Sequence, residues 1–160
     1  MKHILLILII LLCSGCTNTE PKINTTSIEY KDNYDTYYGH LIIPKIKMNQ
    51  GFYNEKSKLN NVNKNIELIP TGIKNTYLFA AHSGVGNIAY FNNLIYLKKG
   101  DEIIIQFKNK TNKYEITKIK KEPKTGKINI PNKENIVILT TCDQIKKGYQ
   151  LIILASLIKT

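Results

Sequence analysis

Short apolar runs alternate with turn-forming residues along most of the chain after residue 36. β-Branched and aromatic side chains fill these runs, and such residues favour pleated sheet. Gly, Pro and Asn stand between the runs, where they favour turns. The pattern predicts seven or eight short strands, at 37–44, 48–53, 76–81, 102–107, 113–119, 128–130, 135–142 and 150–158.

Two segments between these strands carry a helical pattern instead. Ser57 is a good N-cap, and Leu59 and Val62 follow it at a three-residue spacing, which predicts a short helix over 57–64. Apolar residues at near-helical spacing predict a second short helix over 88–97. The fold class is therefore all-β, with one or two short helices, and either a sandwich or a closed barrel fits this pattern.

The first 15 residues have the pattern of an export signal, with Lys2 before an apolar core at 4–12 and small residues before a cut. That core is too short for a membrane-spanning helix, which needs about 20 residues. Leu12-Cys13-Ser14-Gly15-Cys16 resembles a bacterial lipobox, although Cys13 stands where that motif usually has leucine. We expect Cys16 to become a lipidated N-terminus, and the alternatives are a simple cleaved signal peptide or an uncleaved anchor.

The rest of the chain divides into a tether and one domain. Residues 16–37 are polar, with few apolar side chains, which is typical of a flexible tether between membrane and domain. Residues 38–160 are numerous enough to bury a hydrophobic core, and we expect them to form a single domain.

The basic residues are all lysine, and the formal net charge of the chain is +11. Removal of residues 1–15 takes away one lysine and leaves +10, a charge that favours polyanionic surfaces such as anionic lipid or wall polymers. The lysines are scattered and the arginine fork that reads bases and phosphates is missing, so we expect no nucleic-acid partner.

Two strand ends carry side chains suited to catalysis, His82 after the run 76–81 and Cys142 after the run 135–141. If Cys16 is acylated, Cys142 is the only free thiol of an exported protein, and such a thiol is a candidate for reactivity. A thiol needs a basic or positive neighbour to react at neutral pH, which His82 supplies if the two strands are neighbours that run the same way. A packed histidine and a buried structural cysteine are the alternatives. We find no cluster of ligands that suggests a bound metal.

Several stretches of the domain resemble sortases, the cysteine transpeptidases of Gram-positive bacterial surfaces. Leu139-Thr140-Thr141-Cys142 is similar to that family's Thr-Leu-x-Thr-Cys signature, with Ile138 in place of the first threonine. Further similar stretches follow the family's order, at 39–46, 81–84, 89–94 and 97–101. The resemblance spans about residues 38–157, nearly the whole domain, and is far more specific than the short cysteine motif alone.

The resemblance implies a closed eight-stranded β-barrel and a two-step acyl transfer without cofactor or metal. Cys142 would be the nucleophile that attacks a Leu-Pro-x-Thr-Gly-like sorting signal, and His82 its acid–base partner. Thr141 and Ser83 would lie beside the substrate. The implied partners are surface proteins or pilins that bear sorting signals, and a wall-precursor or protein amine. We expect a monomer, anchored through its N-terminus at the extracytoplasmic face of the cell membrane.

The chain departs from the family at one position. Sortases place an arginine at the start of the strand after the cysteine, and Gln150 stands there in this sequence. An amide can stabilise an oxyanion, so Gln150 is the first candidate replacement, and Lys146 or Lys147 is the alternative. A third outcome is a weak or inactive enzyme. It leads to a second hypothesis, a catalytically silent lipoprotein that binds a sorting-signal peptide or an anionic wall polymer.

Overall fold

The computed structural model describes residues 36–158 of the 160-residue chain. The expected export signal, the lipidation site at Cys16 and the tether up to residue 35 lie outside the described residues, so these expectations remain predictions. No helix within residues 36–158 has the length and apolar composition that a membrane span requires.

Strands account for most of the regular structure between residues 36 and 158, as the alternating pattern predicts. Two short 3-10 helices, η1 and η2, interrupt the strands. The elements are β1 Gly39–Ile43, η1 Pro44–Ile46, β2 Met48–Phe52, β3 Glu67–Ile69, β4 Tyr77–Ala80, η2 Asn92–Tyr96, β5 Glu102–Phe107, β6 Lys110–Pro123, β7 Ile136–Cys142 and β8 Tyr149–Leu157.

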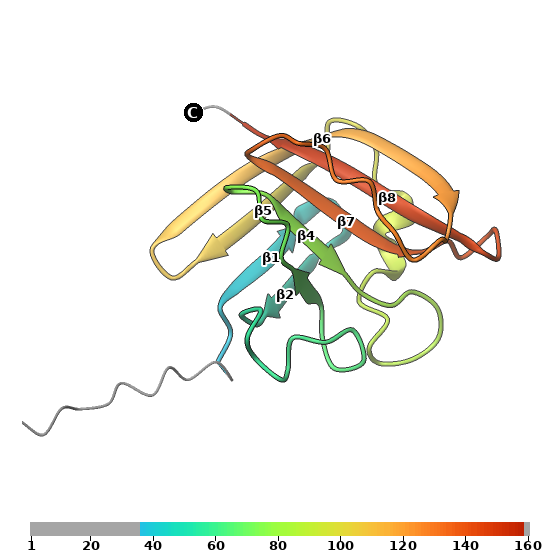
Figure 1. The fold of residues 1–160 in the computed structure, drawn as a ribbon, viewed down its shortest axis with the longest axis horizontal. Helices are drawn as coiled ribbons and strands as arrows, with labels where there is room; N and C mark the ends of the chain where they lie inside the picture. Colours follow the sequence, from blue (N-terminus) through green and yellow to red (C-terminus); the bar gives the residue numbers. More distant parts are fainter. Residues whose placement is uncertain (1–35, 159–160) are drawn as a thin grey trace, which may run out of the picture. The chain divides into compact units, whose positions relative to one another are not determined.

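One sheet contains all eight strands, in the order β2-β1-β5-β6-β8-β7-β4-β3. Every neighbouring pair is antiparallel except β4 and β7, whose arrows point the same way in Figure 1. The two end strands are brought together by Asn65, whose Nδ2 donates to Gly51 O at 3.0 Å while its Oδ1 accepts from Gln50 Nε2 at 3.0 Å. The sheet is therefore a nearly closed eight-stranded barrel, and the predicted fold class is confirmed.

Both faces of the sheet are covered by apolar side chains. The larger cluster lies on the inner face and includes the fully buried Phe52, Phe79, Phe91, Tyr114 and Leu139. A smaller cluster lies on the outer face and consists of Leu78, Ile136, Ile138 and Ile152, with Ile128 and Ile130 packed against it. Because β7 is buried on both faces, it reads in the sequence as a continuous apolar run.

The strand expected at 128–130 is absent, because the sheet order leaves it no partner. β8 lies between β6 and β7, so the connection at 124–135 must cross the outer face of β8 to link them (Figure 1). A segment that crosses a strand cannot pair with it edge to edge. Ile128 and Ile130 instead use their side chains to cover the outer cluster.

The helix expected at 57–64 is also wrong, and turns occupy that segment instead. Ser57 Oγ does accept a hydrogen bond from Leu59 N at 3.0 Å, as a helix cap would. Beyond it, side chains compete for the backbone donors: Asn63 N donates to Asn61 Oδ1 at 2.8 Å. The helix expected over 88–97 is present only as the short η2.

Candidate active site

The parallel pairing of β4 with β7 builds the site. Tyr77 to Ala80 face Val137 to Thr140 in register, and Ala81 N donates to Thr140 O at 3.4 Å. His82 and Cys142 each lie two residues beyond the Ala80–Thr140 pair, so they leave the barrel at the same rim. The condition that the sequence left open, two neighbouring strands running the same way, is therefore met.

Two hydroxyl groups fasten these strand ends to each other. Thr141 Oγ1 donates to Ala81 O at 2.8 Å, and Ser83 Oγ donates to Cys142 O at 2.7 Å. Thr141 is buried and Ser83 is half-buried. Both hydroxyls thus fix the backbone on either side of the rim, and their contact with a substrate stays a prediction.

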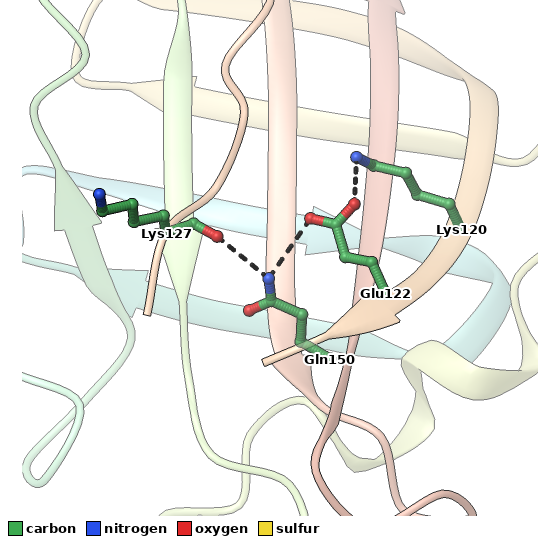
Figure 2. Close-up of polar contacts among 4 residues, drawn as sticks. All are labelled: Lys120, Glu122, Lys127 and Gln150. Carbon is green, nitrogen blue, oxygen red and sulfur yellow. Dashed lines mark hydrogen bonds and ion pairs between the residues drawn. The ribbon is translucent and has the colours of Figure 1, made fainter. Parts of the chain in front are cut away.

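Gln150 is the direct cross-strand neighbour of Cys142, and Glu122 is the neighbour of Gln150 on its other side. Directly opposed residues of antiparallel strands share a face, so all three side chains start from the outer face of the sheet. Gln150 Nε2 donates to Glu122 Oε1 at 3.4 Å and to Lys127 O at 3.3 Å (Figure 2). Glu122 in turn forms an ion pair with Lys120 at 2.6 Å.

These contacts affect the role expected for Gln150, which is to donate a hydrogen bond to an oxyanion in place of the family's arginine. A primary amide has two donor hydrogens, and Nε2 of Gln150 lies within hydrogen-bonding distance of two acceptors in the protein. In this arrangement the donor end of the amide is turned toward contacts within the protein. Its assignment as the replacement for arginine stays a prediction that requires these contacts to open.

The imidazole of His82 has a partner from the connection between β2 and β3. His82 Nε2 lies 3.1 Å from Asn63 Oδ1, a contact that orients the ring and in which Nε2 donates when it carries the ring hydrogen. No hydrogen bond joins the imidazole to the Cys142 thiol within the described part of the chain.

The Cys142 thiol is partly exposed and is not in a disulfide. Its closest polar contact is Lys124, whose Nζ lies 3.3 Å from Sγ. The thiol, on the last residue of β7, thus stands beside an ammonium group.

Asp143, the next residue, is held inside the loop between β7 and β8. Its side chain is 1% exposed and forms an ion pair with Lys121 at 3.0 Å. The Ile145 N–H donates to Asp143 Oδ1 at 3.0 Å, and this bond, together with Lys121, lowers the pKa of the carboxyl group. Both hydrogen bonds go to Oδ1, and the buried Oδ2 has no hydrogen-bond partner among the described residues beyond its ion pair with Lys121. Lys146, one candidate cation, lies 3.5 Å from the centre of the Tyr149 ring.

Two of these contacts could not be predicted from the sequence. Lys124 lies between two predicted strands, and Asn63 lies in the segment predicted as a short helix. Both belong to connections rich in Lys and Asn, where nothing distinguishes one residue from the next. Each reaches the site through a contact between residues distant in sequence, which requires the folded barrel.

Comparison with known proteins agrees with this architecture. A sequence model described as the sortase domain matches residues 41–158. No curated protein sequence matches the chain at a significant level. Among solved structures, sortase A of Listeria monocytogenes superposes with a TM-score of 0.65 at 20% identity, over 77% of this chain and 88% of that one.

Two further solved structures are similar as well. Sortase C1 of Streptococcus agalactiae gives a TM-score of 0.64 at 21% identity, over 79% of this chain and 71% of that one. Sortase C1 of Streptococcus suis gives 0.63 at 22% identity, over 78% and 72%. At such identities the structural likeness shows the fold. The sortase-domain match covers most of the chain, and the chain therefore belongs to the sortase family of cysteine transpeptidases.

Proposed function

We propose that the protein cleaves a Leu-Pro-x-Thr-Gly-like sorting signal through a thioester on Cys142 and transfers the acyl group to an amine of the cell wall or of a pilin. The observation that carries the proposal is the parallel register of β4 and β7. Cys142 is the last residue of β7 and His82 lies two residues beyond β4, so both side chains start from one rim of the barrel. Sites built on strands hold reacting groups more precisely than sites built on loops.

The first step forms the acyl-enzyme. The thiolate of Cys142 attacks the threonine carbonyl carbon, a C–S bond forms, and the carbonyl oxygen takes up negative charge. The C–N bond to glycine then breaks, and protonated His82 gives a proton to the departing amine. In the second step an incoming amine attacks the thioester, His82 takes up a proton from that amine, and the C–S bond breaks to release the thiolate.

The experiment uses the full-length protein in detergent with a library of Leu-Pro-x-Thr-Gly-like peptides and an added amine. Mass spectrometry of the intact protein should show a peptide adduct on Cys142 that the amine then discharges. Cys142→Ala should lose the adduct, and His82→Asn should form it far more slowly. If no peptide yields a Cys142-dependent adduct or transfer product, this proposal is wrong.

We also propose that export and lipidation at Cys16 anchor the protein at the extracytoplasmic face of the membrane. The support is the signal-like pattern of residues 1–15 and the lipobox-like sequence before Cys16. Growth with a labelled fatty acid should label the wild type and leave Cys16→Ala unlabelled. Equal labelling of both proteins would contradict the lipidated anchor.

One observation favours a second candidate function, a binding protein without turnover. The amide nitrogen of Gln150, at the position of the family's arginine, already contacts two acceptors within the protein. Such a protein would bind sorting-signal peptide or anionic wall polymer through its basic surface. Binding that weakens with salt and survives Cys142→Ala, without any acyl-enzyme, would favour this function over transpeptidation.

A further inference from the structure

The cation closest to the reacting sulfur comes from the connection between β6 and β7. Lys124 follows β6 directly, and its Nζ lies 3.3 Å from Cys142 Sγ. We propose that Lys124 is the catalytic cation of this arginine-free chain, and that it stabilises first the Cys142 thiolate and then the oxyanion of the acyl-transfer step. The oxyanion part of the proposal rests on the proposed transpeptidase function, and the thiolate part stands on the contact alone.

Two hydrogen bonds hold the segment that carries Lys124 beside the rim. The backbone N–H of Lys124 donates to Gly148 O at 2.8 Å, which ties it to the turn between β7 and β8. Three residues later, Lys127 O accepts from Gln150 Nε2 at 3.3 Å (Figure 2). Gln150 thereby acts as a positioning residue, since it anchors the segment from which Lys124 reaches the thiol.

Three other lysines near the rim have partners of their own. Lys120 pairs with Glu122 at 2.6 Å, and Lys121 pairs with Asp143 at 3.0 Å. Lys146 lies over the ring of Tyr149. Among residues 36–158, no carboxylate lies within ion-pair distance of Lys124, so its charge is not neutralised by a partner and acts on the sulfur.

An ammonium group can stabilise both negative charges of the proposed reaction, the one on the thiolate sulfur and the one on the carbonyl oxygen. It has three donor hydrogens on a flexible stem, so it can contact sulfur and retain donors for a second acceptor. When the thiolate attacks a carbonyl carbon, its negative charge moves to the carbonyl oxygen, one bond away from the new C–S bond. Lys124 is exposed, and the contact with Sγ is the one hydrogen bond of its side chain among the described residues, so the side chain can follow that displacement.

A substrate-free measurement tests the thiolate part. We compare Lys124→Gln with Lys124→Arg, which keeps the charge, and with Lys133→Gln, which removes the same charge from the far end of the same connection. Because Lys124 is exposed and water screens its charge, a unit charge at this distance changes an ionisation equilibrium by roughly ten-fold. Lys124→Gln should therefore lower the thiolate absorbance at neutral pH by about that factor.

Alkylation by uncharged iodoacetamide should slow by only about three-fold, because a less stabilised thiolate is a stronger nucleophile. Lys124→Arg and Lys133→Gln should stay close to the wild type in both measurements. Thermal unfolding of each variant checks that the fold is intact, as expected for changes at exposed residues. An unchanged thiolate signal in Lys124→Gln, or an equal loss in Lys133→Gln, overturns the proposal.

A single-turnover measurement of acyl-enzyme formation tests the oxyanion part. Lys124→Gln should form the thioester about 100-fold more slowly, the usual loss when an oxyanion donor is removed, and Lys124→Arg should recover most of the rate. If Gln150→Ala abolishes acylation while Lys124→Gln does not, Gln150 is the donor and the inference about Lys124 is wrong. A wild type that forms no acyl-enzyme refutes the proposed function, and the alkylation rates still decide the effect of Lys124 on the thiolate.

Discussion

Replacement of Asp143 by Asn tests whether the loop after the nucleophile is held by a buried charge. The Asp143 side chain is 1% exposed, accepts from the Ile145 N–H at 3.0 Å and lies 3.0 Å from Lys121 Nζ. Asparagine keeps the size of the side chain and an oxygen acceptor for Ile145. The substitution therefore removes the charge with little change in packing.

The expected loss of stability follows from these two contacts. A hydrogen bond to a charged acceptor contributes about 1.5–3 kcal/mol and a neutral one about 0.5–1.5, so loss of the charge costs about 1 kcal/mol at Ile145. The ion pair adds about 0.5 kcal/mol, because Lys121 is 41% exposed and water screens it. The total of about 1.5 kcal/mol corresponds to a fall in Tm of roughly 6 °C for a domain of this size.

The pH dependence gives the sharper test. The hydrogen bond from Ile145 and the nearby Lys121 keep the pKa of Asp143 below its ordinary value of 3.8, so the folded protein binds this proton more weakly than the unfolded chain does. The stabilisation is present above about pH 4 and is lost as the pH falls through the folded-state pKa. Thermal melts of both proteins should differ at pH 7 and converge at low pH.

An exposed carboxylate provides the control for this experiment. Glu55→Gln removes one negative charge from an exposed position and should change Tm by less than about 2 °C at any pH. If Asp143→Asn melts with the wild type at pH 7, or if the gap between them is the same at low pH, the buried charge does not stabilise this loop.

Three further predictions concern the histidine, the barrel and its tyrosines. Asn63→Ala should lower kcat about ten-fold by freeing the His82 ring, and Asn63→Asp, which keeps an acceptor at 3.1 Å, should retain more activity without a change in Tm. Gly39→Ala should destabilise the fold by about 1–3 kcal/mol in denaturant unfolding, because the added Cβ would lie 2.7 Å from Gln106 O. Burial raises the pKa of Tyr114 to about 12, so spectroscopic titration should show it ionising after exposed tyrosines, and stability should fall as the pH rises above about 10.

Strand positions were predictable wherever one local pattern decided them. The run 102–107 lies between a Lys-Gly turn and a Lys-Asn turn, and the structure forms β5 over the same residues. Ile128 and Ile130 have the same apolar character but no strand to pair with, because β8 separates β6 from β7. A short apolar run shows that a segment is buried, and the sheet order decides whether its backbone pairs.

The site residues could likewise be identified from local sequence patterns, whereas their contacts with residues distant in sequence could not. His82 and Cys142 could be named from the sequence, because each ends an apolar strand and each lies in a stretch that resembles sortases. Gln150 could be named from its position in the chain, but its contacts with Glu122 and Lys127 O could not. Those contacts depend on which strands lie beside β8, and no local sequence pattern predicts that.

The amino-acid sequence by itself determined that this protein is an all-β domain of the sortase family with a thiol and an imidazole at strand ends. Strand propensity and turn chemistry act between residues a few positions apart, so they can be read along the chain. The tertiary structure alone decided which strands are neighbours and which connection crosses the outer face. It thereby placed Lys124 beside Cys142 and Asn63 beside His82, because loop side chains meet only after the barrel has brought distant segments together.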